Sequence, residues 1–366
     1  MDMENCYIAP IDESYNRQML SILANSPIVA NGLSLCFDKA PDIFAIPRLK
    51  YSTSEHAGFF QQESLKGFAS LGYYDAFVGG QEERVFTFYN FFLLPELRGD
   101  RIAGMAMKEF FSRAREKANY GISVTLKGNR PAESYIGRQV HDWMPPTRII
   151  DELVVKSIFL SYSKQNKTEY PVRNARLEDI PDIIKLLNEE HRQRDFGLIF
   201  QEEGFLSALD KRGLEITDYY VATNRKGAIK GVCLAWDCFP FRRTRVLKFS
   251  ANFYPLLFAY KVLEKFLPMA PFPEKGESFH ELTITDYAVA DRNIVILHAL
   301  LSEIYYRNLN RKYHFMNFAS CRSDKLLKAA TGFWHKDIVS HIIFTSLDAA
   351  RYTLQTRLPY IDIAFL

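Results

Sequence analysis

The segment that most restricts the possible folds runs from residue 84 to residue 118. It begins with RVFTFYNFFLLP, in which both alternating sets of side chains are apolar, so the pattern predicts a strand covered on both faces. A polar loop, ELRGDR, follows, and IAGMAMKEFFSRAREKA then places its apolar residues along one stripe, which predicts an amphipathic helix. A buried strand that leads into a helix favours the α/β class, here as an α+β arrangement with a mixed sheet.

The loop between this strand and this helix is suited to binding an anion. The first N–H groups of a helix have no partner within the helix and point outward, and the helix dipole adds partial positive charge. Arg98 and Arg101 add guanidinium groups at the same place, beside Gly99. The sequence therefore predicts an anionic ligand at residues 98–104.

The order of predicted elements repeats along the chain. In the first half, the strand at 84–94 is followed by the helix, by a strand at 120–128 and by a short helix that begins near NRPAESY. The polar segment SKQNKTEYPVRN then indicates a linker, and a second buried strand, ELTITDYAV, again precedes an apolar helix, NIVILHALLSEIYYRNL. Because 366 residues suffice for two domains, we place these at 1–165 and 166–366.

Composition narrows the function classes. A formal net charge of only +3 gives no support to a nucleic-acid binder. No run of about 18 apolar residues is present, and MDMENCYIAP lacks the features of a secretory signal. The five cysteines are scattered, and neither CxxC nor HExxH occurs, so we expect neither disulfides nor a metal site. We expect a cytoplasmic protein with no nucleic-acid or membrane partner.

The motifs of the first half resemble those of the GNAT superfamily of acyltransferases. That pattern is a central strand, a proline, Arg/Gln-x-x-Gly-x-Gly/Ala at the start of a helix, and Asn-x-x-Ala-x-x-x-Tyr after the next strand. Here the first element reads Arg98 to Ala103, and the second reads Asn129 and Ala132, with Tyr135 one residue early. The tracts NGLSLCFDKAPDIF, CLAWDCFPFRRTRVLKFS and LPMAPFPEKGESFHELTITDYAV look like those of bacterial tandem two-domain GNAT-like proteins. The resemblance therefore implies two tandem GNAT-like domains.

The resemblance also implies a cofactor, a reaction and residue roles. The cofactor is acetyl-coenzyme A or another acyl-coenzyme A, and a small-molecule or peptide amine attacks its thioester directly. The implied cofactor contacts, made by the main chain of the strand and by the loop, are Phe92, Leu94, Arg98, Gly99, Asp100, Arg101, Ile102, Ala103, Gly104 and Asn129. Tyr135 would protonate the leaving thiolate. A carboxylate would remove the proton of the ammonium group; Asp75, Glu82 and Glu83 are the candidates, and Glu83 is the working assignment.

Two departures from the family pattern leave alternatives open. Arg101 stands where the family usually has a glycine, so its bulk could close the site, or its guanidinium could itself contact the phosphates. The corresponding loop of the second half, AVADRNIVILHA, has no glycine and only Arg292, so we expect no coenzyme A there. The rival functions are a non-catalytic GNAT-fold binding module and an aminoacyl-tRNA-dependent transferase. The sequence identifies neither the acceptor nor the oligomeric state.

Overall fold

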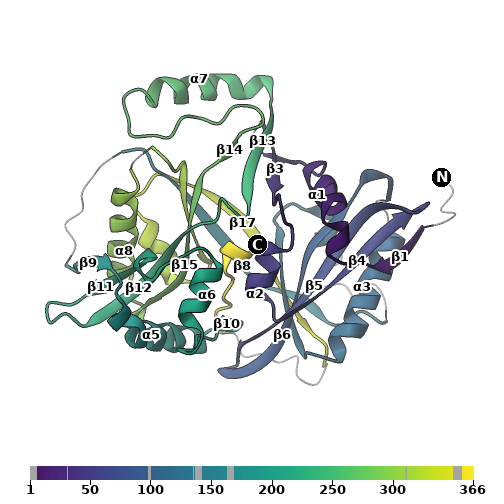
Figure 1. Cartoon of the computed structure of the whole chain (residues 1–366), viewed down its shortest axis with the longest axis horizontal. Coiled ribbons are helices and arrows are strands. Elements are labelled where there is room, and N and C mark those ends of the chain that lie inside the picture. The colour runs from purple at the N-terminus through teal and green to yellow at the C-terminus, as the bar shows by residue number, and fades with distance from the viewer. Residues whose placement is uncertain are drawn as a thin grey trace.

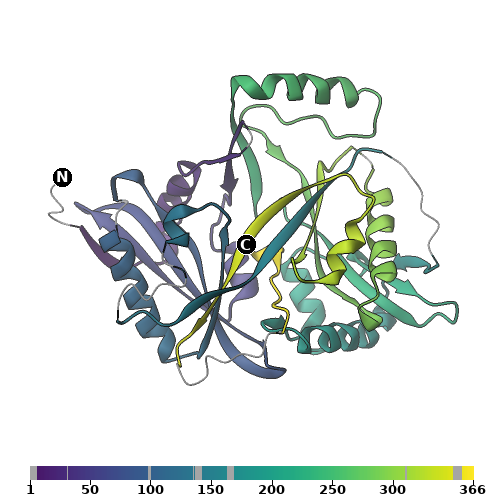
Figure 2. The same cartoon turned by 180° about the vertical axis from the view of Figure 1, so that it is seen from behind.

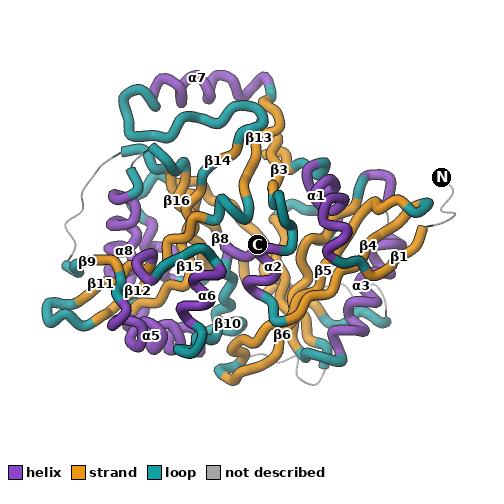
Figure 3. Tube along the Cα trace, in the orientation of Figure 1, coloured by secondary structure: helices purple, strands orange, loops and turns teal. Residues whose placement is uncertain are grey.

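The protein is a mixed α/β molecule in which helices lie on both faces of one large sheet (Figures 1 and 3). The computed structural model describes residues 6–30, 32–97, 100–134, 136, 142–162, 169–309, 311–348 and 357–366. The α-helices are α1 (Asn16–Ala24), α2 (Ala45–Lys50), α3 (Asp100–Arg115), α4 (Arg130–Glu133), α5 (Ile180–Arg192), α6 (Phe205–Lys211), α7 (Tyr254–Leu263) and α8 (Ile294–Arg307). The strands are β1 (Cys6–Pro10), β2 (Ile28–Ala30), β3 (Leu33–Asp38), β4 (Thr53–Gln61), β5 (Ser64–Val78), β6 (Gln81–Leu93), β7 (Tyr120–Leu126), β8 (Thr147–Phe159), β9 (Val172–Asn174), β10 (Gly197–Leu198), β11 (Tyr219–Thr223), β12 (Ile229–Asp237), β13 (Arg243–Phe249), β14 (Ser278–Phe279), β15 (Glu281–Val289), β16 (Phe315–Cys321) and β17 (His335–Ser346).

The large sheet contains both halves of the chain. Its strand order is β1-β4-β5-β6-β7-β17-β8-β16-β15-β12-β11-β9, and β10 pairs with β5 off this path. From either edge inward, the two halves repeat one pattern: antiparallel strands lead to a long central strand, β6 or β15, which then pairs in parallel with β7 or β16. The repeated element order that the sequence predicts is therefore present.

The two halves exchange strands at the centre of the sheet. β17, from the end of the chain, lies between β7 and β8 and is antiparallel to both, and β8 lies between β17 and β16 (Figure 2). Each half thus completes its own sheet with a strand from the other half. The division at 1–165 and 166–366 stays a prediction, because the sheet is continuous across it.

A second, four-stranded sheet also joins the halves. Its order is β14-β13-β3-β2, and β3 of the first half is antiparallel to β13 of the second. Helix α7 lies beyond this sheet at the top of Figure 1 and has no buried residue; Phe258, for example, is 72% exposed. No helix in the described part of the chain has both the length and the apolar character needed to cross a bilayer.

The predicted strand–loop–helix segment folds as its apolar pattern requires. The strand prediction at 84–94 corresponds to β6, and the helix begins at Asp100. Ala106, Phe110 and Phe111 of α3 are at most 1% exposed and pack against β4, β5 and β6. Burying each such phenylalanine contributes roughly 1.5–3 kcal/mol, so this stripe fixes α3 on one face of the sheet. On the opposite face, Val85 of β6 shares a hydrophobic cluster with Phe196 and Ile363 of the second half, and α1 packs near the end of β6 at Phe92.

Candidate functional site

The central strand β6 contains a bulge near its end. In the register with β5, Phe68 lies opposite Phe92 but Ser70 lies opposite Tyr89, so β6 has one extra residue there. Asn90 occupies the bulge with a φ of +53°, a left-handed conformation that asparagine tolerates better than most residues. The bulge bends β6 and changes the direction of its free edge.

Strands β6 and β7 diverge just before this bulge. Their parallel register pairs only Val85 with Tyr120 and Phe86 with Gly121. Gly121 is required at this crossing, because a Cβ there would come within 2.2 Å of the Phe86 ring. Beyond Phe86, the described part of β6 has no ladder partner on its β7 side, so this edge is open to a ligand that could hydrogen bond to the main chain.

Those predicted loop contacts that belong to the described residues lie just beyond the open edge, in the first turns of α3. Ile102 lies on the buried face of α3, at 6% exposed, and Ala103 follows it in the first turn of the same helix. A Cβ at Gly104 would meet no atom within 4 Å, so the helix is uncovered on that side. Arg98 and Gly99 lie outside the described residues, as do the side chains of Asp100 and Arg101.

The remaining predicted cofactor contacts differ in how far their groups are already engaged within the protein. Phe92 packs against Phe68, with 5.4 Å between ring centroids. The main chain of Leu94 is already used: its N–H donates to Lys66 O at 2.9 Å, and its carbonyl accepts from the N–H of Leu97 at 3.0 Å. Asn129 is the residue before α4, and its side-chain amide donates to Thr125 Oγ1 at 3.3 Å. Tyr135 lies outside the described residues.

Sequence reasoning missed a lysine at the bulge. Lys39 follows β3 and is only 8% exposed, and its Nζ donates to Asn90 Oδ1 at 2.9 Å. Burial lowers the pKa of Lys39 to about 7, and the nearby positive charge of Arg242 acts in the same direction. The quoted tract NGLSLCFDKAPDIF includes this lysine, but no motif distinguishes it from a surface lysine.

The predicted carboxylates line a cavity between the two halves. This cavity of about 520 Å³ is bounded by α2, β5 and β6 on one side and by β10, α6 and β15 on the other. Asp75, Glu82 and Glu83 all contribute to its wall. Glu83 is seven residues before Asn90 on the same strand, so the two are on the order of 20 Å apart at about 3.3 Å per residue.

The second half supplies a charged group to the same cavity. Asp286 is fully buried and accepts hydrogen bonds from Arg212 Nη1 at 2.9 Å and from the Tyr219 hydroxyl at 3.0 Å. Across the cavity, burial lowers the pKa of Lys50 to about 8, although the negative charge of Asp362 opposes this shift. The wall therefore combines carboxylates and cations, which suits a polar ligand that carries charged groups.

The second half repeats the bulge and the divergence. Asp286 occupies a bulge in β15 with a φ of +43°, and β15 pairs with β16 only from Glu281 to Thr283. Here, however, side chains fill the opening. The Tyr287 hydroxyl donates to the carbonyl of Ala319 on β16 at 3.0 Å, so it bridges the two diverging strands.

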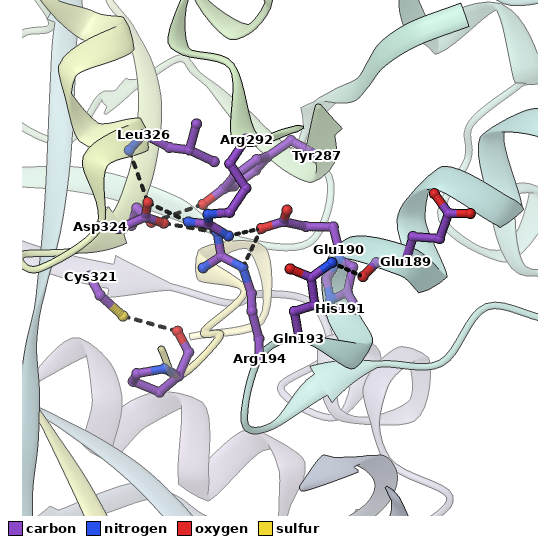
Figure 4. Close-up of polar contacts among 12 residues, drawn as sticks. Glu189, Glu190, His191, Gln193, Arg194, Tyr287, Arg292, Cys321, Asp324 and Leu326 are labelled. Atoms are coloured by element: carbon purple, nitrogen blue, oxygen red, sulfur yellow. Dashed lines mark hydrogen bonds and ion pairs between the residues drawn. The ribbon is translucent and has the colours of Figure 1, made fainter. Parts of the chain in front are cut away.

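A buried ionic cluster closes the rest of this second opening (Figure 4). Arg194 contacts Glu190 Oε1 through Nε at 2.7 Å and Asp324 Oδ2 through Nη2 at 2.8 Å, and Arg292 contacts the same two carboxylates. Burial alone would raise the pKa of Asp324, but Arg194, Ser320 and Arg292 outweigh it and lower that pKa to about 2. The only arginine of the second loop is thus held inward by the protein itself.

No group of three or more histidine, cysteine, aspartate or glutamate side chains suitable for a metal ion occurs among the described residues. What the first half offers instead is an open strand edge, a helix start and a buried lysine. These features can hold and orient an extended polar ligand along β6, and Lys39 can exchange a proton beside it.

Comparisons with known proteins give a fold but no close relative. No family model and no curated protein matches the sequence. In structure, the chain is similar to N-myristoyltransferase from Saccharomyces cerevisiae with bound myristoyl-CoA, at 13% identity and a TM-score of 0.61, over 94% of this chain and 80% of that one.

Two bacterial structures are also similar to the chain. A probable N-acyltransferase from Enterococcus faecalis matches at 12% identity and a TM-score of 0.52, over 96% of this chain and 74% of that one. A GCN5-related N-acetyltransferase from Anabaena variabilis matches at 10% identity and a TM-score of 0.53, over 94% of this chain and 73% of that one. At such identities the likeness shows the fold alone, and it confirms the predicted α/β class with two GNAT-like units in tandem.

Proposed function

We propose that this chain, which has the GNAT fold in both halves, transfers an acyl group from coenzyme A to an amine at the site in its first half. The observation that carries the proposal is the bulge at Asn90 together with the divergence of β6 from β7. An extended molecule such as the pantetheine arm can add to this edge as a further strand would, by hydrogen bonding to the main chain. The structural neighbours include proteins described as acyltransferases, one with bound myristoyl-CoA, which supports the same ligand class.

The residues at the end of the open edge suit the anionic part of coenzyme A. The first turn of α3 presents N–H groups and a positive dipole end, and Gly104 leaves one side of that turn uncovered. Arg98 and Arg101 would add charge-assisted hydrogen bonds to the pyrophosphate. Leu94 would contribute little through its main chain, because both its N–H and its carbonyl are already hydrogen bonded within the protein.

Bound coenzyme A would supply an activated acyl thioester, and the chain would position the attacking amine. Holding two reactants in a reactive geometry is worth roughly 7–11 kcal/mol of the barrier. A main-chain N–H at the bulge would stabilise the oxyanion that forms on the thioester carbonyl. The acceptor would enter along the face of β6 that carries Lys39 and the cavity, and acetyl is the simplest acyl group. In this proposal Tyr135 protonates the departing thiolate.

The second half serves as a wall of the acceptor cavity and not as a second catalytic unit. Tyr287 and the cluster around Arg292 occupy the space where a ligand would otherwise lie. Arg212 and Asp286 meanwhile face the cavity that the predicted carboxylates also line. The filled opening of this half supports a non-catalytic module as the second candidate, because side chains of the protein itself occupy the place of a ligand there.

Thermal unfolding with acetyl-coenzyme A tests the proposal. A ligand at 100 times its dissociation constant stabilises a protein by about 2.7 kcal/mol, so wild type should unfold several degrees higher. Arg98→Ala should weaken the shift, and Arg225→Ala, an exposed arginine in a loop of the second half, should not. Loss of the shift in Arg101→Gly would make Arg101 a ligand contact. If saturating acetyl-coenzyme A leaves wild type unchanged, the proposal fails; firm binding without acylation of any amine would favour the non-catalytic module.

A further inference from the structure

The surroundings of Lys39 distinguish it from an ordinary structural lysine. Its side chain is buried, yet among the described residues no carboxylate lies within ion-pair distance of its Nζ. Asp38, the nearest acid in sequence, faces Arg243 and Arg245 at 3.7 and 3.8 Å and accepts from the N–H of Ala40. The hydrogen-bond partner of Lys39 Nζ is the neutral side-chain amide of Asn90. A buried ammonium without a counter-ion is costly, so this position favours the neutral amine.

The loop that carries Lys39 is held from both halves of the molecule. Arg243 of β13 donates to the carbonyl of Ala40 at 2.5 Å, and Asn16 of α1 donates to the carbonyl of Pro41 at 2.8 Å. The pairing of β3 with β13 fixes the segment before the lysine. Lys39 is therefore positioned by main-chain contacts that do not depend on its own charge, and a fixed position is what a proton-transfer group needs.

The contact with Asn90 places this amine at the reacting end of the open edge. Asn90 is the bulge residue where β6 has just left β7, and the proposed thioester carbonyl lies against the main chain of the same bulge. The carboxylates of the cavity wall are farther along the strand; Glu83 is on the order of 20 Å from Asn90. Among the described groups that can accept a proton, Lys39 is the one that hydrogen bonds to Asn90 itself; the nearby His56, whose ring lies 6.4 Å from that of Tyr89, hydrogen bonds instead to Ser70 Oγ on β5.

We propose that Lys39 is the general base of acyl transfer, an inference that rests on the function proposed above. The neutral Lys39 amine takes one proton from the acceptor's ammonium group, and the freed amine attacks the thioester carbonyl. The C–N bond forms, the C–S bond breaks, and coenzyme A leaves as a thiolate that takes the proton of Tyr135, as proposed above. The second proton of the nitrogen then restores the tyrosine. Lys39 then releases its proton to water, so one proton is produced for each acyl group transferred.

Burial and charge support the required protonation state near neutral pH. The charged groups around Lys39 are Arg242 and Arg243 from the second half and Asp38 from its own loop, whereas β6 presents the neutral Asn90. Burial and Arg242 together lower the pKa of Lys39 to about 7, which is near the value at which a general base is most effective.

Two measurements test this inference separately from the function. The first is a pH titration of lysine ¹³Cε resonances in the intact protein, with Lys39 assigned by its absence in Lys39→Arg. The Lys39 resonance should titrate with a midpoint near pH 7, whereas an unperturbed lysine titrates at about pH 10.4. A midpoint above pH 9 would overturn the assignment, whether or not the protein acylates any amine.

The second measurement is the pH profile of kcat/KM for acylation of an amine found by screening with acetyl-coenzyme A. Lys39→Arg and Lys39→Gln can both still donate to Asn90 but cannot accept the proton, so kcat should fall roughly 10²–10⁴-fold while acetyl-coenzyme A binding is unchanged. Raising the pH should partly restore activity in both variants. The exposed Lys226→Arg should behave as wild type. Full activity in Lys39→Arg would refute the role of Lys39, whereas absent coenzyme A binding in wild type would instead refute the proposed function.

Discussion

Replacing Glu190 by glutamine should destabilise the protein strongly, although the substitution barely changes the shape of the side chain. Glu190 is 4% exposed and contacts both Arg194 and Arg292, which in turn share Asp324. The cluster has two guanidinium groups and two carboxylates, so the substitution leaves one buried positive charge without compensation. Breaking a buried pair by removing one partner costs about 3–5 kcal/mol, and the retained amide oxygen places this variant near the lower end.

The chain contains a matched control for this substitution. Glu303 lies near the end of a helix, as Glu190 does, and pairs with Arg307 four residues later, but the two side chains are 35% and 40% exposed. Because exposed pairs contribute about 0–1 kcal/mol, Glu303→Gln should cost no more than that. The structure thus predicts a difference of about 2 kcal/mol or more between two identical substitutions in similar helical positions.

Urea denaturation measures this difference, since the free energy of unfolding follows from the midpoint and the slope. The two variants should share the slope of wild type and differ in midpoint. Equal losses of stability in Glu190→Gln and Glu303→Gln would refute the reasoning, because the burial of the cluster would then have no energetic consequence. Coenzyme A binding should be unchanged in Glu303→Gln, which lies away from the first-half site.

Three further predictions concern pH, the bulge and the surface. The pKa of Asp324 is lowered from 3.8 to about 2 in the folded state, so the stability that its ionised form contributes is present above pH 3.8 and is lost as the pH falls through 2. Asp324→Asn should therefore remove about 2 kcal/mol from the change in unfolding free energy between pH 4 and pH 2, as measured by chemical denaturation. Asn90→Val should be about 1–2 kcal/mol less stable than Asn90→Gly, because both lose the contact with Lys39 but only valine opposes the positive φ; equal midpoints would contradict the bulge. Phe258→Asp on the exposed helix α7 should change stability by less than about 0.5 kcal/mol, whereas Phe110→Ala in the core should cost about 3–5 kcal/mol in the same assay.

The parts of the fold that local pattern determines could be predicted from the sequence. Strand β6 is apolar on both faces because α3 covers one face, whereas α1 and residues of the second half pack on the other, and both alternating sets of its side chains are accordingly apolar. The stripe that includes Ala106, Phe110 and Phe111 predicted the buried side of α3. That the second loop binds no cofactor stays a prediction from its missing glycine; the structure adds that Arg292 pairs inward with Glu190 and Asp324.

The parts that depend on long-range pairing could not be predicted. β8 and β17 are adjacent although roughly 180 residues separate them, and no local pattern specifies which strands pair across such a distance. The bulge at Asn90 leaves no trace in the alternation, because apolar residues occupy both sets of positions there. Lys39 is placed at the site by its contact with Asn90, which is 51 residues away in the sequence, so no local pattern identifies it. The roles of Glu83 and Tyr135 stay predictions.

Amide hydrogen exchange with and without acetyl-coenzyme A tests the central claim most directly, because it locates the ligand as well as detecting it. The account predicts slower exchange on binding in residues 87–93 of β6 and in the first turn of α3. It predicts no change in β15 after Thr283 or at the start of α8, where Tyr287 and Arg292 already fill the corresponding opening. Protection in the second half, or no protection at saturating acetyl-coenzyme A, would contradict a coenzyme A site at the diverging strands of the first half.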